Sequence, residues 1–116
     1  MLITATEIYC ANSGDSRAIL IQGTSVYDLS DDHKPDNEDE LIRIEAAGYN
    51  VTDGRIASKL ALSRAIGDLA YKQNANLSVE AQAITCVPDV TRRNRSDKDS
   101  FVLIACDGIW DVLSSA

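Results

Sequence analysis

Two aspartates near the end of the sequence, Asp107 and Asp111, stand four residues apart and directly follow the apolar run 101–106. If residues 109–115 form a helix, side chains four apart share one face, so both carboxylates are directed into the same space. Carboxylates held that close repel each other unless a cation or a proton lies between them. Oxygen ligands without histidine or thiolate suit hard ions such as Mg²⁺ or Mn²⁺. Asp107 and Asp111 are therefore candidate metal ligands.

The segment before these aspartates must position them. Its unbroken apolar character and β-branched residues predict a strand that is buried on both faces, and Asp107-Gly108 marks its exit from the sheet. A purely structural interpretation also exists, because an aspartate at a strand-to-helix junction commonly caps the helix or complements its dipole. These residues alone leave both interpretations open.

Three other segments accompany Cys106-Asp-Gly-Ile-Trp-Asp111 in a characteristic order. They are Asn12-Ser-Gly-Asp15-Ser-Arg17, Asp32-His-Lys-Pro35 and Ser63-Arg-Ala-Ile-Gly-Asp68. On these motifs the chain resembles the metal-dependent protein serine/threonine phosphatases of the PPM family, type 2C. The resemblance extends from about residue 3 to residue 113.

The resemblance implies an α+β fold in which two antiparallel sheets, each covered by helices, form a four-layer α-β-β-α sandwich. It implies hydrolysis of phosphoserine and phosphothreonine in proteins by a metal-activated water, using two Mg²⁺ or Mn²⁺ ions and a third, more weakly held ion. Asp107 then resembles a ligand of a core metal, whereas Asp111 and Asp15 resemble ligands of the third ion, which also uses Asp107. No side chain is assigned as catalytic, because the nucleophile is water. Without the resemblance, Asp15 is interpreted as a turn residue.

Two of the family's metal-site segments have no counterpart in residues 1–116. One is an N-terminal segment with an Asp-Gly-His-Gly motif and a phosphate-binding basic residue, and the other is a C-terminal Asp-Asn pair. We therefore expect the chain to be a partial PPM-type domain, a central to C-terminal fragment, and we do not expect this fragment to be active alone. Its expected partners are a phosphoprotein substrate and the missing portions of the same domain.

Charge and hydropathy exclude several other classes of protein. The chain carries 11 basic and 18 acidic residues, a formal net charge of -7, which argues against nucleic acid or an anionic membrane as partner. No stretch approaches the roughly 20 apolar residues of a membrane span, and the start of the sequence lacks the basic region of a secretory signal. An intracellular protein, cytoplasmic or nuclear, is expected.

The first half of the chain predicts a small meander and one helix. Residues 8–11 and 18–21 are expected to pair through a tight hairpin at Gly14-Asp15, followed by a strand over 25–29. Residues 35–47 predict a helix with Asp36 or Asn37 as N-cap and Gly48 just after its end. The acidic run 38–40 is interpreted as a solvated helix start, not as a metal cluster.

The second half predicts short strands and loops. A turn within 49–57 separates two short strands, 73–82 is a loop or short irregular helix, and 83–87 and 90–93 are strands. Arg64 and Asp68 are given a structural role and are expected to pair if their turn is helical. His33, the only histidine, is interpreted as a loop residue that bonds locally to backbone.

The three cysteines are expected to be reduced and buried. Cys86 and Arg92 match the spacing of cysteine-dependent phosphatases, but the intervening segment has no glycine to cradle a phosphate and places Asp89 where anion-binding amides are needed.

Two alternative functions complete the analysis. A non-catalytic PPM-like binding or regulatory module is the second hypothesis, although Asp15, Asp107 and Asp111 weigh against a decayed site, because unpaired carboxylates lower stability. A phosphotransferase with Asp107 as nucleophile ranks last, because Ile109 stands where a second aspartate is needed.

Overall fold

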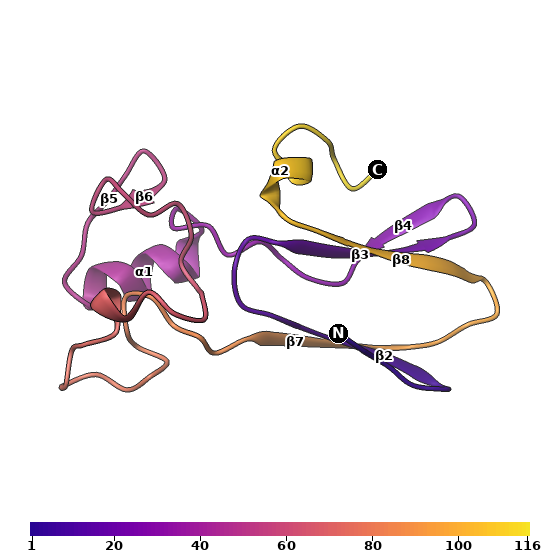
Figure 1. Ribbon diagram of the computed structural model, residues 1–116, viewed down its shortest axis with the longest axis horizontal. Helices are drawn as coiled ribbons and strands as arrows, with labels where there is room; N and C mark the ends of the chain where they lie inside the picture. The colour runs from indigo at the N-terminus through magenta and orange to yellow at the C-terminus, as the bar shows by residue number, and fades with distance from the viewer. The chain divides into compact units, whose positions relative to one another are not determined.

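Strands make up most of one part of the chain, and loops with a single longer helix make up the other (Figure 1). The computed structural model describes all 116 residues and divides into two units. The first unit comprises Met1–Asn12, Ser16–Asp32 and Asp89–Ala116, and the second comprises Ser13–Asp15 and His33–Pro88. The chain is therefore mixed α+β, with antiparallel sheets.

The first sheet of the first unit has the strand order β1-β2-β7, with antiparallel pairing throughout. Its strands are β1 (Leu2–Ile3), β2 (Glu7–Asn12) and β7 (Asp89–Asn94). Side chains alternate along β2, so that Ile8 and Cys10 are buried while Glu7 and Tyr9 are not. Glu7 forms an ion pair with Arg92 of β7. The period of two thus gives strand β2 one buried, apolar side and one more exposed, polar side.

The second sheet of the first unit has the order β4-β3-β8, again antiparallel. Its strands are β3 (Arg17–Gln22), β4 (Ser25–Asp28) and β8 (Asp99–Ala105). Gln22 is in register with Ser25, so Gly23 and Thr24 alone connect β3 to β4. Gly23 has a φ of 61°, a left-handed conformation that favours glycine in such two-residue connections. The strand predicted over 25–29 thus forms as β4.

The predicted hairpin at Gly14-Asp15 is wrong. The strands that flank it, β2 and β3, both form, but β2 pairs with β1 and β7, whereas β3 pairs with β4 and β8. The connection between them therefore leads from one sheet to the other, and the meander contains only β3 and β4. Local turn residues could not reveal this, because the partner strands β7 and β8 lie far along the chain.

Both sheets contribute to the hydrophobic core of the first unit. Ile8 and Cys10 of β2 pack with Ala18 and Leu20 of β3 and with Leu29. Leu20 is 1% exposed and is the most deeply buried member of this cluster. The core therefore depends on the inward positions of strands from two different sheets.

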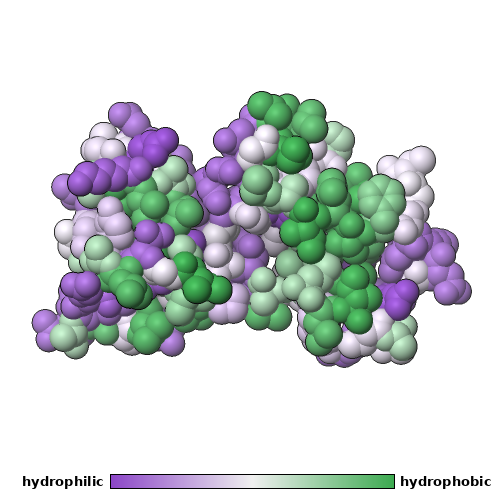
Figure 2. Space-filling view, in the orientation of Figure 1, coloured by the Kyte–Doolittle hydropathy of each residue, from purple (hydrophilic) through white to green (hydrophobic).

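Strand β8 forms where the apolar run predicted a strand, but its burial on both faces is wrong. Phe101 and Ile104 are 57% and 59% exposed. The reason is that β8 pairs with β3 alone at the edge of its sheet, and of its side chains only Val102 packs against the core of the first unit. Figure 2 shows apolar surface in the region of β8 and of the helix that follows it, α2 (Asp107–Trp110).

The second unit contains the helix α1 (Glu38–Ala46), the two-stranded β5 (Val51–Thr52) and β6 (Arg55–Ile56), and the 3₁₀ turn η1 (Leu69–Tyr71). Asn37 is the N-cap of α1, Ala47 is the C-cap, and Gly48 follows with a φ of 90°. The predicted helix, the position of its N-cap and its glycine stop are confirmed, but the helix begins at Glu38, three residues later than predicted, and the Asn37 side chain makes no capping hydrogen bond.

The core of the second unit consists of three isoleucines, Ile44 of α1, Ile56 of β6 and Ile84, each fully buried. Residues 83–87 were predicted to be a strand, but they form only a single bridge, between Thr85 and Arg64. Residues 73–82 form a loop without a helix. The longest helix of the chain, α1, has nine residues, and no helix is long and apolar enough to cross a membrane.

Candidate metal centre

Asp107 and Asp111 lie at the two ends of the short helix α2. Cys106 precedes the helix in an extended conformation, Asp107 is its first residue, and Asp111 is its C-cap. The backbone N–H of Asp111 donates to the carbonyl oxygen of Asp107 over 2.7 Å. The helix thus begins two residues earlier than the predicted 109–115 and is shorter, but it places the two aspartates one helical turn apart, as the spacing predicted.

Trp110 fixes this helix to the end of strand β8. Its indole Nε1–H donates to the carbonyl oxygen of Ala105, the last residue of β8, over 2.7 Å. The hydrogen bond therefore links Trp110, the third residue after Asp107, to the strand that directly precedes Asp107. A helix of four residues has little stability of its own, so such a tether decides where its side chains lie.

The carboxylates of Asp107 and Asp111 have no hydrogen-bond or ion-pair partner in the structure. Asp107 is partly buried, and Asp111 is exposed. Two anionic groups one turn apart that form no ion pair favour the binding of a cation. Because both donors are carboxylates and no histidine joins them, the chemistry of this pair fits Mg²⁺ or Mn²⁺ better than Zn²⁺.

The pair supplies only part of a metal's coordination sphere. No group of three histidine, cysteine, aspartate or glutamate side chains comes together as a metal cluster. Hard divalent ions take six or more oxygen ligands, which water or other carboxylates must complete.

Asp15 lies in the second unit, whereas Asp107 and Asp111 lie in the first. The Nζ of Lys34 is 3.0 Å from Oδ2 of Asp15. Next to Asp15, the N–H of Gly14 donates to Nδ1 of His33 over 3.2 Å, and the N–H of His33 donates to the carbonyl oxygen of Gly14 over 3.0 Å. The Asn12–Arg17 and Asp32–Pro35 motifs are therefore joined here. His33 does bond to backbone, but to Gly14, 19 residues away, so the predicted local bonding is wrong.

Sequence reasoning missed a buried polar network around Glu40. This residue was interpreted as part of a solvated helix start, but it is only 3% exposed. Its carboxylate accepts from Arg64, whose Nη2 is 2.7 Å from Oε1, from Arg43 at 2.9 Å, and from the hydroxyl of Ser63. Burial raises the pKa of Glu40, but the hydrogen bonds from Arg64, Arg43 and Ser63 outweigh it and lower the pKa to about 2.

The same network corrects the expected partner of Arg64. Arg64 pairs with Glu40 and also donates to the carbonyl oxygen of Val87, over 3.2 Å. The turn that contains Asp68 is not helical, and Asp68 itself has a left-handed conformation with a φ of 50°. The structural role predicted for Arg64 fits these contacts, while the local pairing does not form.

The cysteines are free, but only Cys10 is buried, and its burial raises the pKa of its thiol. Cys86 and Cys106 are exposed, which corrects the expectation that all three are buried. Arg92 is engaged by Glu7 and not by a phosphate-binding loop.

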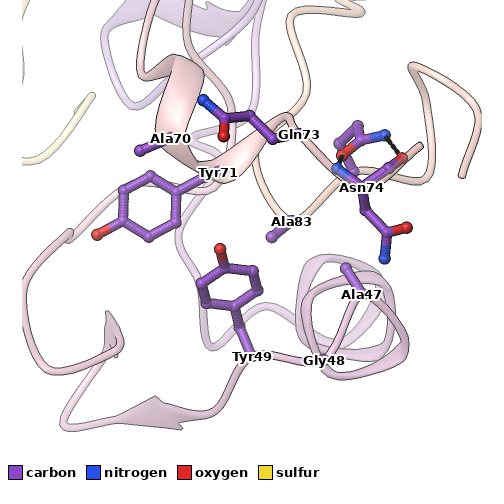
Figure 3. A pocket seen from close by; sticks show the side chains of 9 residues that line it. Ala47, Gly48, Tyr49, Ala70, Tyr71, Gln73, Asn74 and Ala83 are labelled. Atoms are coloured by element: carbon purple, nitrogen blue, oxygen red, sulfur yellow. Dashed lines mark hydrogen bonds between the residues drawn. The ribbon is translucent and has the colours of Figure 1, made fainter. Parts of the chain in front are cut away.

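A pocket of about 430 Å³ opens in the second unit. Figure 3 shows the rings of Tyr49 and Tyr71 together on one side, with a centroid separation of 5.4 Å, and the Asn74 side chain on the other. No carboxylate, imidazole or thiol lines this pocket. It is therefore not the predicted metal centre.

Comparison with known proteins agrees with these motifs. The sequence pattern of the family described as protein phosphatase 2C matches residues 1–116. The chain is 47% identical over 113 residues to probable protein phosphatase 2C 2 of Paramecium tetraurelia, covering 97% of this chain and 38% of that protein. It is 51% identical over 114 residues to protein phosphatase 2C homolog 2 of Aspergillus fumigatus, covering 98% of this chain and 27% of that protein.

A solved structure shows the same fold. The crystal structure of a phosphatase from a pathogenic strain of Toxoplasma gondii matches with a TM-score of 0.83 and 43% sequence identity, covering 88% of this chain and 32% of that chain. The chain belongs to the protein phosphatase 2C family. It spans between about a quarter and two fifths of the length of these relatives.

Proposed function

We propose that this chain is part of a protein serine/threonine phosphatase that hydrolyses phosphoserine and phosphothreonine in proteins and depends on Mg²⁺ or Mn²⁺. The observation that carries the proposal is the pair of unpartnered carboxylates on α2, in a chain whose whole length matches the phosphatase 2C family. Membership of this family also implies that the enzyme depends on metal ions and acts on phosphoproteins.

The proposed roles of Asp107, Asp111 and Asp15 follow from their carboxylate oxygens, which are suitable ligands for these ions. When bound, Mg²⁺ or Mn²⁺ lowers the pKa of water and stabilises negative charge on phosphoryl oxygens. We assign Asp107 to a core metal, and Asp111 and Asp15 to a third ion that shares Asp107. Lys34 already forms an ion pair with Asp15, so a cation that binds Asp15 must compete with Lys34. This competition is consistent with the assignment of Asp15 to the most weakly bound of the three ions.

We further infer that the two sheets form part of a four-layer α-β-β-α sandwich. The shared core of Ile8, Cys10, Ala18 and Leu20 and the similarity to the Toxoplasma gondii phosphatase support this architecture. Residues 1–116 are then a partial phosphatase domain, and other portions of the same domain are its partners. An intracellular location remains a prediction of the sequence.

The proposal is tested by Mn²⁺-dependent release of phosphate from a phosphothreonine peptide by the protein that carries these 116 residues. Asp107→Asn is compared with Asp97→Asn, which changes an exposed aspartate in the turn between β7 and β8. We expect Asp107→Asn to lower the rate by more than about 100-fold, since even outer-sphere partners of a metal are worth about 10–100-fold, and Asp97→Asn to be neutral. Wild-type activity that persists in EDTA and in Asp107→Asn would contradict the proposal, and a wild-type protein without activity would favour the binding module.

A further inference from the structure

Arg17 of strand β3 lies beside the end of strand β8. It is in register with Ala105, the last residue of β8 and the acceptor of the Trp110 indole hydrogen bond. The guanidinium carbon of Arg17 is 5.2 Å from the centroid of the Trp110 ring, within the range of a cation–π contact. The indole between Asp107 and Asp111 is therefore held at its N–H by β8 and at its ring by β3.

A second contact fixes the orientation of the Arg17 guanidinium. Its Nε and Nη2 donate to Oδ1 and Oδ2 of Asp32, each over 2.9 Å, which is a bidentate pair. The side chains are 24% and 14% exposed. Hydrogen bonding to Asp32 raises the pKa of Arg17, so the guanidinium stays charged. A planar fork held in this way presents one fixed face to Trp110, which a lysine ammonium does not.

A third contact reaches the segment after α2. The Nη1 of Arg17 donates to the hydroxyl oxygen of Ser115 over 2.9 Å, and that hydroxyl donates to Oδ1 of Asp28 in β4 over 2.7 Å. Arg17 therefore contacts the chain both within α2, at Trp110, and after it, at Ser115.

The helix has few other contacts that could set its position. Ile109, Val112 and Leu113 are exposed, so apolar burial does not anchor it. The tethers from Ala105 and Arg17 to Trp110 are thus the specific interactions that orient the turn carrying both carboxylates.

We propose that Arg17 is a positioning residue for the metal centre, which acts through Trp110 to hold α2 so that Asp107 and Asp111 bind one cation site. Metal ligands must be held close to their productive geometry by a supporting set of side chains. The inference rests on the proposed function, because it takes Asp107 and Asp111 as metal ligands.

The test uses Tb³⁺, a hard oxygen-seeking cation, with excitation of Trp110, the only tryptophan among residues 1–116. Sensitised terbium luminescence reports a cation close to Trp110 without requiring phosphatase activity. We expect the dissociation constant for Tb³⁺ to rise about 10- to 100-fold in Arg17→Met, and less in Arg17→Lys, which keeps the charge without the planar fork.

The matched control is Arg93→Lys. Arg93 lies in β7 of the same unit, and its guanidinium carbon is 3.9 Å from the Tyr27 ring centroid, so it loses a similar contact without touching α2. It should leave the dissociation constant unchanged. A weakening equal to that of the Arg17 variants would show a general effect of stability and would overturn the positioning role.

Asp107→Asn separates the two proposals. Wild-type affinity in both Arg17 variants, with luminescence lost in Asp107→Asn, would overturn the role of Arg17 and leave the metal site standing. Luminescence that is absent in the wild type or unchanged in Asp107→Asn would overturn the metal assignment itself. If Arg17→Met does not fold, Arg17→Lys decides the question, because its smaller expected weakening is still measured against Arg93→Lys.

Discussion

The carboxylate of Glu40 and the guanidinium of Arg64 form a buried ion pair, with 2.7 Å between Oε1 and Nη2. The two residues are 24 positions apart, one in helix α1 and the other in the loop that follows β6. Arg43 and Ser63 complete the shell around the same carboxylate. The second unit is therefore held together by a polar network beside its isoleucine core.

Glu40→Gln should destabilise the protein by roughly 3–5 kcal/mol, because it leaves the buried guanidinium groups of Arg43 and Arg64 without their counter-charge. Urea denaturation followed by circular dichroism measures this loss. Glu38→Gln is the control, since Glu38 is exposed on the same helix and should change stability by less than about 0.5 kcal/mol. Equal midpoints for the two variants would refute the role assigned to Glu40.

Stability should also depend on pH through Glu40. Its pKa is about 2 in the folded protein against an ordinary value of 4.5, so folding favours the ionised carboxylate. The contribution is fully present above pH 4.5 and is lost as the pH falls through 4.5 towards 2; by linkage it amounts to about 3 kcal/mol. Denaturation curves between pH 6 and 2.5 should show this loss in the wild type and a flatter profile in Glu40→Gln. Parallel profiles would argue against it.

Residues Ala57 and Ser58 form a turn that is strained. Both have left-handed conformations, with φ of 49° and 57°. This conformation is unfavourable for any residue with a Cβ atom, that is, for any residue except glycine. Ser58→Gly should therefore raise stability by roughly 0.5–1 kcal/mol despite the flexibility of glycine in the unfolded chain. Thermal melts check this increase. As a control, Ser25→Gly in strand β4 should lower the melting temperature, and a decrease in both would contradict the strain.

We expect residues 1–116 to self-associate through strand β8, because this strand has an unpaired edge and exposed apolar side chains. This strand pairs only with β3 and exposes Phe101 and Ile104. Unpaired edges with apolar side chains promote association between copies. Light scattering after gel filtration should give a mass that rises with concentration, and Ile104→Lys should reduce it. A wild-type chain that stays monomeric and unfolds cooperatively would rule this out.

Local sequence signals predicted the local structure. Asn37 as N-cap, three acidic residues in the first turn and Gly48 after the end defined helix α1. The Asp107 and Asp111 spacing placed both aspartates on one turn, because both lie within a few residues of the same strand end. These features depend on neighbours in the chain, which a single sequence displays.

The long-range features could not be predicted in the same way. The pairing of β2 with β7 and of β3 with β8 joins segments about 80 residues apart, so the turn residues between β2 and β3 suggested a hairpin that does not form. The burial of Glu40 depends on Arg64, and the contact between Arg17 and Trp110 depends on strand register. The sequence near Glu40 and near Arg17 contains no pattern that predicts these partners.

The most direct test of the metal centre is a Mn²⁺ titration followed by electron paramagnetic resonance, in which free Mn²⁺ gives a signal and bound Mn²⁺ loses it. The protein that carries this chain is compared with Asp107→Asn and with Asp97→Asn. Our account predicts that the wild type and Asp97→Asn remove Mn²⁺ from solution equally and that Asp107→Asn removes less at the same concentrations, because it loses a ligand of one core metal and of the third ion. Equal binding by all three proteins would contradict the assignment of Asp107 as a metal ligand.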